Sequence, residues 1–228
     1  MRLGDWPWRL IALLMLALFA GRPALATDIS LQSCVARLNT VAADPEKAGN
    51  PSRFDCNIRQ NRLGSGDFLT ELRFDPVPVD PRDPLVLRTS SLWQEREIIR
   101  FHYGDGSSAR LDMDSAGSSA YLTLGAVMEF PVPVRAAPLT RITIETRGAA
   151  NLRGVVVGAR LVPVSEAVKA KLAYTAIYAG FAGLALSLLI YNLSLWRALR
   201  NRFQLYYCLM VGALGAYAFT SSGAILLV

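Results

Sequence analysis

The feature that most constrains this chain is a long run without charge near its C-terminal end. Residues 172–195, LAYTAIYAGFAGLALSLLIYNLSL, contain no acidic or basic side chain, and residues 203–228 form a second such run. A helix needs about 20 apolar residues to cross the hydrocarbon core of a bilayer. The sequence therefore predicts two transmembrane helices, over 172–195 and 203–228, joined by a loop at 196–202.

The charges beside these runs predict how the helices are oriented. The loop carries Arg197, Arg200 and Arg202, and short loops rich in basic residues stay in the cytoplasm. The net charge of +6 lies mostly beside apolar runs, whereas residues 27–171 are close to neutral. A nucleic-acid partner needs a basic surface, so none is expected, and the lipid bilayer is the expected partner.

An export signal is predicted at the N-terminus. Arg2 and Arg9 bracket the polar start, the apolar run LIALLMLALFAG follows, and the small-residue pattern ALA ends at Ala26. This run is too short to span a bilayer, and the small residues suit cleavage by signal peptidase. The alternatives are an uncleaved anchor or a buried helix. Residues 1–26 are thus expected to be a signal peptide and residues 27–165 an exported domain.

Two cysteines fall in the exported part. An oxidising compartment favours a disulfide between Cys34 and Cys56, because exposed free thiols are a liability there. Two unrelated thiols are the alternative. Cys208 lies in an apolar run and is expected to pack as a small hydrophobic residue.

Short runs of alternating side chains predict that the exported domain is a β-sandwich or jelly roll. In EIIRFHY, Ile99, Phe101 and Tyr103 share one face, whereas Arg100 and His102 share the other. A period of two marks a strand with one buried face. Many short strands separated by turn residues are typical of sandwiches and jelly rolls.

Eight strands are expected, at 67–74, 85–91, 96–103, 109–113, 120–124, 127–134, 140–147 and 153–162. Residues 75–84, DPVPVDPRDP, are instead expected to connect strands, because proline removes the donors that a central strand needs. Two prolines in FPVPV likewise indicate an edge strand for 127–134.

Catalysis is not expected from these residues. His102 is the one histidine, so a histidine-pair metal site cannot form, and no nucleophile elbow or phosphate-binding glycine motif is present. No cofactor and no metal site are expected, although Asp112 and Asp114 could bind Ca²⁺ weakly. The candidate ligand-binding residues are Trp93, Arg100, His102, Tyr103 and Tyr121, and for the aromatic ones core or edge packing is the alternative.

Small residues recur at four-residue spacing in both apolar runs. Such stripes let helix backbones approach closely, and a polar side chain such as that of Asn192 seeks a partner helix. Together the two stripes suggest a larger helical bundle that includes these two helices; the alternative is that the small residues are ordinary span composition. The expected packing positions are Gly183, Asn192, Gly212 and Ala216.

Residues 186–219 resemble the first two helices of a bacterial family, the seven-transmembrane receptors with diverse intracellular signalling modules. The matching motifs are Tyr191-Asn192-Leu193, Leu199-Arg200-Asn201-Arg202 and Leu205-Tyr206-Tyr207. The preceding β domain is similar to that family's extracellular jelly-roll sensor domain, which resembles carbohydrate-binding modules, and 148–163 looks like its closing strand. The resemblance covers most of residues 67–228.

The resemblance implies a multi-pass sensory receptor of a bacterial inner membrane. Its N-terminal domain would lie in the periplasm, bind a small molecule or a carbohydrate, and pass a signal to the helices; a homodimer is compatible with this role. In the family the output module is commonly a diguanylate cyclase or a histidine kinase. Five helices and that module are not among these residues, so the resemblance implies either a fragment of a longer protein or a truncated product. The alternative is a membrane-anchored β-sandwich used for binding or adhesion, without signalling output.

Overall fold

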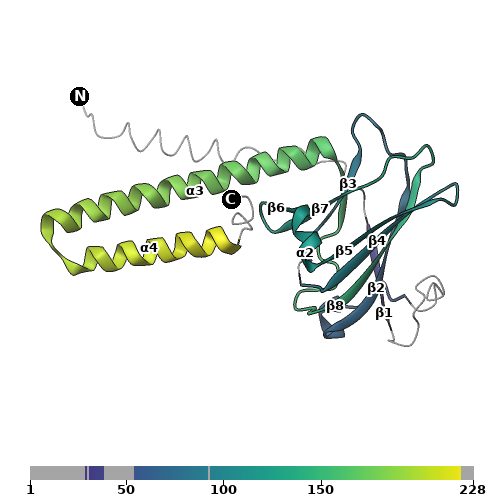
Figure 1. The fold of residues 1–228 in the computed structure, drawn as a ribbon, viewed down its shortest axis with the longest axis horizontal. Helices are drawn as coiled ribbons and strands as arrows, with labels where there is room; N and C mark the ends of the chain where they lie inside the picture. Colours follow the sequence, from purple (N-terminus) through teal and green to yellow (C-terminus); the bar gives the residue numbers. More distant parts are fainter. Residues whose placement is uncertain (1–28, 30, 39–53, 92, 222–228) are drawn as a thin grey trace, which may run out of the picture.

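A computed structural model describes residues 29, 31–38, 54–91 and 93–221. The expected signal peptide and the last part of the second apolar run lie outside these residues. Within the described part, a β domain is followed by two long helices, as Figure 1 shows. The prediction of a mainly β domain followed by two apolar helices is therefore confirmed.

The strands of the described residues form two antiparallel sheets. The five-stranded sheet has the order β1 (Gln32–Arg37), β2 (Gly66–Val77), β8 (Leu139–Ala149), β4 (Arg96–Tyr103), β5 (Ser108–Asp114). The four-stranded sheet has the order β6 (Leu122–Thr123), β7 (Val127–Pro131), β3 (Leu85–Thr89), β9 (Arg160–Pro163). Three short helical turns lie between strands: η2 (Gln60–Leu63), α2 (Ser115–Ser118) and η3 (Ser119–Tyr121).

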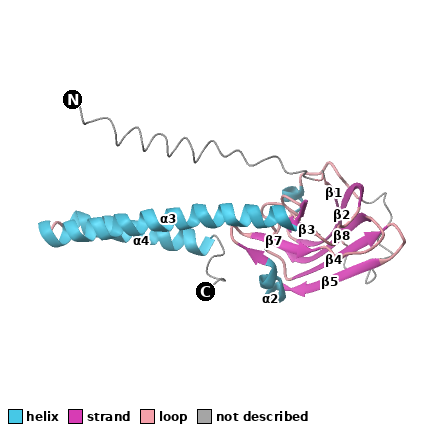
Figure 2. Cartoon of the chain, turned by 90° about the horizontal axis from the view of Figure 1, so that it is seen from above, coloured by secondary structure: helices cyan, strands magenta, loops and turns pink. Residues whose placement is uncertain are grey.

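The two sheets share one hydrophobic core. Alternate residues of each strand point inward, as the period of two requires, and the resulting layers are seen from above in Figure 2. The largest fully buried side chains come from both sheets: Phe68, Leu72, Ile99, Phe101, Ile142 and Ile144 from one, and Leu87, Phe130, Met128 and Leu161 from the other.

Among the strands that differ from the sequence-based prediction, two do so for clear local reasons. β2 continues past Pro76 to Val77, although proline was expected to end it. The register with β8 shifts between Arg73 and Val77, so Pro76 faces no ladder position that requires a donor. β9 is shorter than the expected strand 153–162, because Gly154 and Gly158 both adopt positive φ and hold the preceding segment in a loop.

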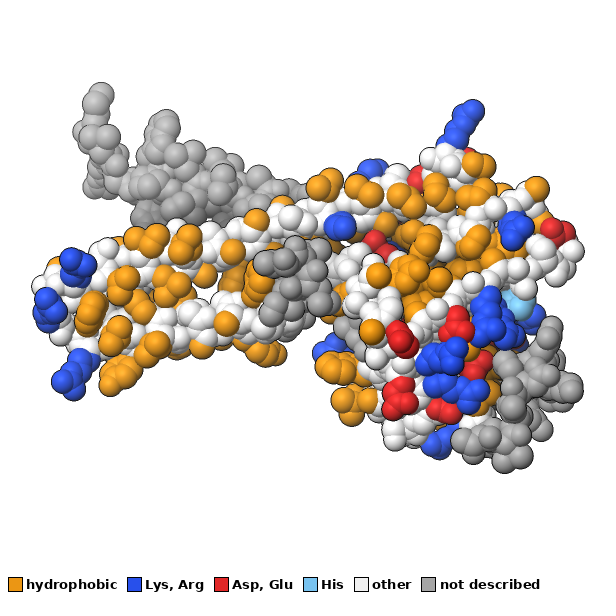
Figure 3. Space-filling model, viewed as in Figure 1, with side chains coloured by type: hydrophobic (Ala, Val, Ile, Leu, Met, Phe, Trp, Pro, Cys, Tyr) orange, Lys and Arg blue, Asp and Glu red, His pale blue; other side chains and the backbone are white. Residues whose placement is uncertain are grey.

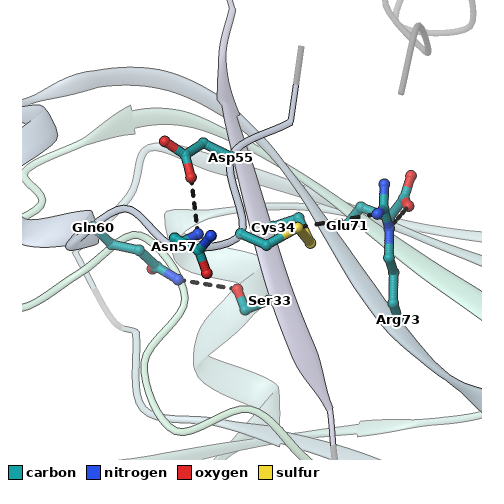
Figure 4. Close-up of a disulfide and its surroundings, with 8 residues drawn as sticks. Ser33, Cys34, Asp55, Asn57, Gln60, Glu71 and Arg73 are labelled. Atoms are coloured by element: carbon teal, nitrogen blue, oxygen red, sulfur yellow. Dashed lines mark hydrogen bonds and ion pairs between the residues drawn. A yellow bond between two sulfur atoms is a disulfide. The ribbon is translucent and has the colours of Figure 1, made fainter. Parts of the chain in front are cut away.

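A disulfide between Cys34 and Cys56 ties β1 to the segment that precedes η2, as predicted. Figure 4 shows Cys34 beside Glu71 and Arg73 of β2. Two backbone hydrogen bonds support the same junction: Val35 N donates to Asp55 O at 2.9 Å, and Asp55 N donates to Val35 O at 3.0 Å. The segment 54–57 is therefore fixed against the edge of the five-stranded sheet.

Helices α3 (Val164–Leu199) and α4 (Arg202–Ser221) form an antiparallel hairpin, and both are long and apolar enough to cross a membrane. The loop expected at 196–202 is reduced to two residues. α3 ends at Leu199, and the following Arg200 adopts positive φ and donates its backbone N–H to Trp196 O at 2.8 Å. Figure 3 shows basic side chains gathered at the hairpin tip, where the sequence has Arg197, Arg200 and Arg202.

The expected packing positions in the helices fall into two groups. Asn192 is buried, and its Nδ2 donates to Leu188 O at 2.8 Å within the same helix. By contrast, a Cβ added to Gly183 or Gly212 would meet no atom within 4 Å, and Ala216 is exposed. Among the described residues, Gly183 and Gly212 therefore do not pack against the other helix of the hairpin.

Candidate ligand-binding site

The outer face of the five-stranded sheet collects polar side chains. On β4, Arg100 and His102 point outward, whereas Phe101 and Tyr103 point into the core. Antiparallel register then sets their neighbours. Arg100 lies opposite Arg110 of β5 and Thr143 of β8. Because opposed residues share a face, these side chains form one continuous row.

Two parallel rows complete the surface. His102 lies opposite Ser108 of β5 and Arg141 of β8. On the other side of the Arg100 row, Ile98 lies opposite Glu145 of β8. Glu71 of β2 extends the middle row, since it pairs with Thr143.

These rows line an open groove with a volume of about 450 Å³. Sites for small molecules have volumes of about 300 to 1,000 Å³, so the groove has the size of a ligand site. The lining residues are Phe54, Leu69, Glu71, Ile98, Arg100, His102, Gly106, Ser108, Arg110, Arg141, Thr143 and Glu145. Figure 3 shows the mixed basic and acidic patch on the outside of the domain.

The carboxylates of this face are already neutralised. The Glu71 side chain, only 9% exposed, pairs with Arg73 and lies 3.6 Å from Nη1 of Arg141. Glu145 accepts a hydrogen bond from Nε of Arg147 at 2.7 Å. These ion pairs leave the acidic side chains little capacity to bind a cation.

Asp112, at the edge of the same face, is held by two arginines. Nε and Nη2 of Arg96 each donate to its carboxylate at 2.9 Å, and Arg110 also donates to it. The hydrogen bonds from Arg96 hold the pKa of Asp112 below its ordinary value, with help from the positive charges of Arg96 and Arg110. This carboxylate therefore stays ionised and paired.

Arg100 is different. It is half-buried on the groove floor, and its guanidinium has no hydrogen-bond or ion-pair partner among the residues that the structure describes. Next to it, the His102 ring lies with Nε2 3.0 Å from Thr143 Oγ1. An unpaired guanidinium between Arg110 and Thr143 can donate two parallel hydrogen bonds to a planar anion such as a carboxylate.

The arrangement favours anion binding over metal chemistry. In the described part of the chain, no group of three or more His, Cys, Asp or Glu side chains could hold a metal ion. Asp112 and Asp114 lie two residues apart on β5, and Asp114 is engaged as the cap of α2, where its Oδ1 accepts from Gly117 N at 2.7 Å.

Of the five candidate ligand-binding residues, Arg100 and His102 line the groove, and the other three lie elsewhere. Tyr103 is buried in the core, where its hydroxyl donates to Pro133 O, and burial raises its pKa. Tyr121 packs on Phe130 with ring centroids 5.3 Å apart. Trp93 is 69% exposed at one end of the domain, outside the groove.

The second functional element is the joint between the β domain and α3. α3 begins directly after β9 and has no linker. Asp83, before β3, accepts hydrogen bonds from the backbone N of Ser165 at 2.9 Å and from its hydroxyl at 2.6 Å. Ala167 is buried against Val86 and Val162 on the outer face of the four-stranded sheet. The first turns of α3 are therefore fixed to the domain.

Substitution of Asp83 tests this joint. Asp83→Ala removes both acceptors at the start of α3, and unsatisfied N–H groups destabilise a first helical turn. We expect amide hydrogen exchange at residues 165–168 to become several-fold faster. Asp80→Ala is the matched control, since the Asp80 carboxylate accepts from Arg82 N in the same connection and makes no bond to α3 among those of the described residues. Equal exchange rates in wild type and Asp83→Ala would mean that packing at Ala167 and the hydrogen bond from Val164 N to Pro84 O hold the joint without Asp83.

Comparison with known proteins does not assign the chain to a family. No protein-family model matches it, and no curated protein matches it either.

Proposed function

We propose that this chain is the sensory part of a membrane receptor, with the groove on the five-stranded sheet as its ligand site. The observation that carries the proposal is Arg100, an unpartnered guanidinium on the floor of a groove of ligand size. The receptor role also draws on the resemblance of residues 186–219 to the opening helices of the seven-transmembrane signalling receptors.

The ligand is a small molecule that carries a carboxylate and hydroxyl groups, such as a sugar acid. Arg100 supplies positive charge and paired N–H donors, and Arg110 beside it is already engaged with Asp112, whereas His102, Ser108 and Thr143 supply groups that can bind hydroxyls. Neutral sugars lack the group that an unpaired arginine recognises best. The carbohydrate-binding-module-like jelly roll implied by the resemblance is consistent with this ligand class.

Signalling requires a mechanical path from the groove to the membrane. The groove lies on one sheet and α3 is attached to the other, across a single packed core. Packed cores are stiff, and the capped, linker-free start of α3 leaves no flexible segment to absorb a displacement. The proposed topology places the β domain in the periplasm and the basic hairpin tip in the cytoplasm of a bacterial cell.

Substitution of Arg100 tests the ligand site. In the full chain reconstituted in lipid nanodiscs, we expect glucuronate and galacturonate to bind and glucose and galactose not to bind. Arg100→Ala should weaken binding of the sugar acid by at least about tenfold, the usual effect of removing a charged hydrogen bond. Arg100→Lys should restore only part of the affinity, because an ammonium lacks the planar pair of donors. Isothermal titration calorimetry measures both effects.

Arg96→Ala is the matched control. Arg96 lies on the same strand and face, but it does not line the groove and is engaged with Asp112. It should leave the affinity within about twofold of wild type. Failure of every sugar acid and simple carboxylate to bind would refute the ligand class. The membrane-anchored binding or adhesion module, which needs no small ligand, would then be the better account.

A further inference from the structure

The path of α3 across the four-stranded sheet shows at which end it leaves the β domain. β9 runs antiparallel to β3, with Leu85 opposite Pro163, and α3 then turns back over the sheet so that Ala167 covers Val86. Farther along, the Tyr174 ring lies next to the turn at Gly125, 3.8 Å from the position of an added Cβ.

This contact fixes which end faces the bilayer. β7 pairs with β3 so that Met128 lies opposite Thr89, which puts the Gly125 turn at the end of the sheet where β3 finishes. Tyr174 belongs to the uncharged run that begins at residue 172. The end of the domain that carries Thr89 and Gly125 therefore lies level with the start of the membrane span. Figures 1 and 2 both show the helices extending away from this end.

Two large hydrophobic side chains are exposed at the same end. Trp93 follows β3 and is 69% exposed, and Leu152 follows β8 and is 79% exposed. They are the two most exposed large hydrophobic residues of the described β domain. Their loops are joined, because Ala150 N donates to Trp93 O at 2.9 Å. Figure 3 shows hydrophobic side chains on the side of the domain that faces the helices.

Basic residues surround this pair of loops. Arg153 is exposed beside Leu152, and the neighbouring turn η2 is flanked by the exposed Arg59 and carries the exposed Arg62. The turn is held against the loop by Asn151, whose Nδ2 donates to Gln60 O at 2.7 Å. Tryptophan prefers the interfacial zone of a bilayer, and arginine prefers its phosphate groups.

We propose that the loops carrying Trp93 and Leu152 insert into the outer interfacial layer of the bilayer that α3 enters. Trp93 then contacts lipid rather than a ligand, and Arg59, Arg62 and Arg153 lie at the level of the headgroup phosphates. The inference rests on α3 crossing the bilayer, not on the identity of the groove's ligand. A domain held at both α3 and these loops cannot swing freely, so its orientation relative to the membrane is fixed.

Depth-dependent quenching tests this contact. The full chain with Cys208→Ala is given one new cysteine, by Leu152→Cys or Trp93→Cys, and is labelled with an environment-sensitive fluorophore. Asp105→Cys is the control, since Asp105 lies in the turn between β4 and β5 at the opposite end of the domain. The chain is reconstituted in phosphatidylcholine and phosphatidylglycerol vesicles, with or without a lipid that carries a nitroxide near its headgroup.

Interfacial side chains lie about 5 to 10 Å into the boundary between headgroups and acyl chains, within reach of this quencher. With the nitroxide lipid, emission from labels at 152 and 93 should fall about twofold, and it should lie at shorter wavelength than emission from the label at 105. The label at 105 should be quenched only by iodide added to the aqueous phase. Unquenched labels at both 152 and 93, in chains that retain the disulfide and insert into the vesicles, would overturn the proposal. Chains that do not insert at all would overturn it too. Neither result depends on sugar-acid binding to the groove.

Discussion

Glu97→Gln is expected to stabilise the β domain by about 3 kcal/mol above neutral pH and to leave it nearly unchanged near pH 4.5. Glu97 points from β4 into the core and is only 3% exposed. Burial raises the pKa of its carboxyl from 4.5 to about 7, although Gln94 Nε2 donates a hydrogen bond to Oε2 at 2.9 Å and partly opposes this effect. The folded protein therefore retains a proton that the unfolded chain loses.

The sign of the pH dependence follows from this difference. Between pH 4.5 and about 7 the folded state binds one more proton than the unfolded state, so the free energy of unfolding falls by about 1.4 kcal/mol per pH unit. The contribution of Glu97 is fully present below its unfolded pKa and is lost as pH rises through its folded pKa. Glutamine keeps the acceptor for Gln94 and carries no titrating proton, so it removes this slope.

Denaturant unfolding of the full chain in detergent micelles, from pH 4 to 8.5, measures this effect. Four aspartates act in the opposite direction at lower pH: Asp67, Asp83, Asp105 and Asp112. Hydrogen bonds hold the pKa of each below its ordinary value. The stability that these carboxylates add is therefore lost as pH falls. Glu95→Gln, at an exposed position two residues away, should leave the slope between pH 4.5 and 7 intact. The same slope in Glu97→Gln as in wild type would show that Glu97 stays ionised in the fold.

Local patterns were sufficient for most of the strands and for the direction of the side chains in them. Alternation in EIIRFHY predicted that Ile99, Phe101 and Tyr103 share a face, and all three are buried in the core. The same alternation already separates Tyr103 from Arg100 and His102, so one site could not include all three. β1 was missed because its six residues alternate weakly, and its place depends on the disulfide and on pairing with β2.

The composition of the groove could not be predicted from local patterns. Arg100 and His102 were recognised on β4, but Glu71, Arg141 and Thr143 were not. They join the groove because β8 lies between β2 and β4 in the sheet, and β8 is distant from both strands in the sequence. Alternation tells which face a residue occupies, whereas neighbour identity depends on strand order and register, which follow from the packing of the whole domain.

Loss of the Cys34–Cys56 disulfide is expected to change the free energy of unfolding by about as much as Glu97→Gln does, but in the opposite direction. The bridge closes a loop over a sequence separation of 22 residues, and the chain-entropy model gives about 3 kcal/mol for a loop of this length. Cys34→Ala with Cys56→Ala should lower the free energy of unfolding by that amount. Alanine is chosen because Cys34 is fully buried, and a serine hydroxyl there would add an unsatisfied polar group.

The bridge should also matter for the groove. It holds the segment that carries Phe54, a lining residue, against β1, and Arg73, which pairs with Glu71, lies with Nη1 4.0 Å from Cys56 Sγ. Without the bridge, this wall of the groove is held to β1 by hydrogen bonds: two between Val35 and Asp55, and one from Gln60 Nε2 to Ser33 Oγ. The double variant should therefore bind the sugar acid more weakly even at temperatures where it remains folded.

Cys208→Ala provides the control, because Cys208 is a free cysteine of α4. It should change neither stability nor binding, and a reducing agent should destabilise it as much as wild type. The same reducing agent should have no effect on the double alanine variant. If reduction weakens binding in wild type while amide exchange in β4 and β8 stays slow, the bridge acts on the groove wall rather than on the core. A loss of less than about 1 kcal/mol would mean that the unfolded chain is already constrained in this region, contrary to the chain-entropy account.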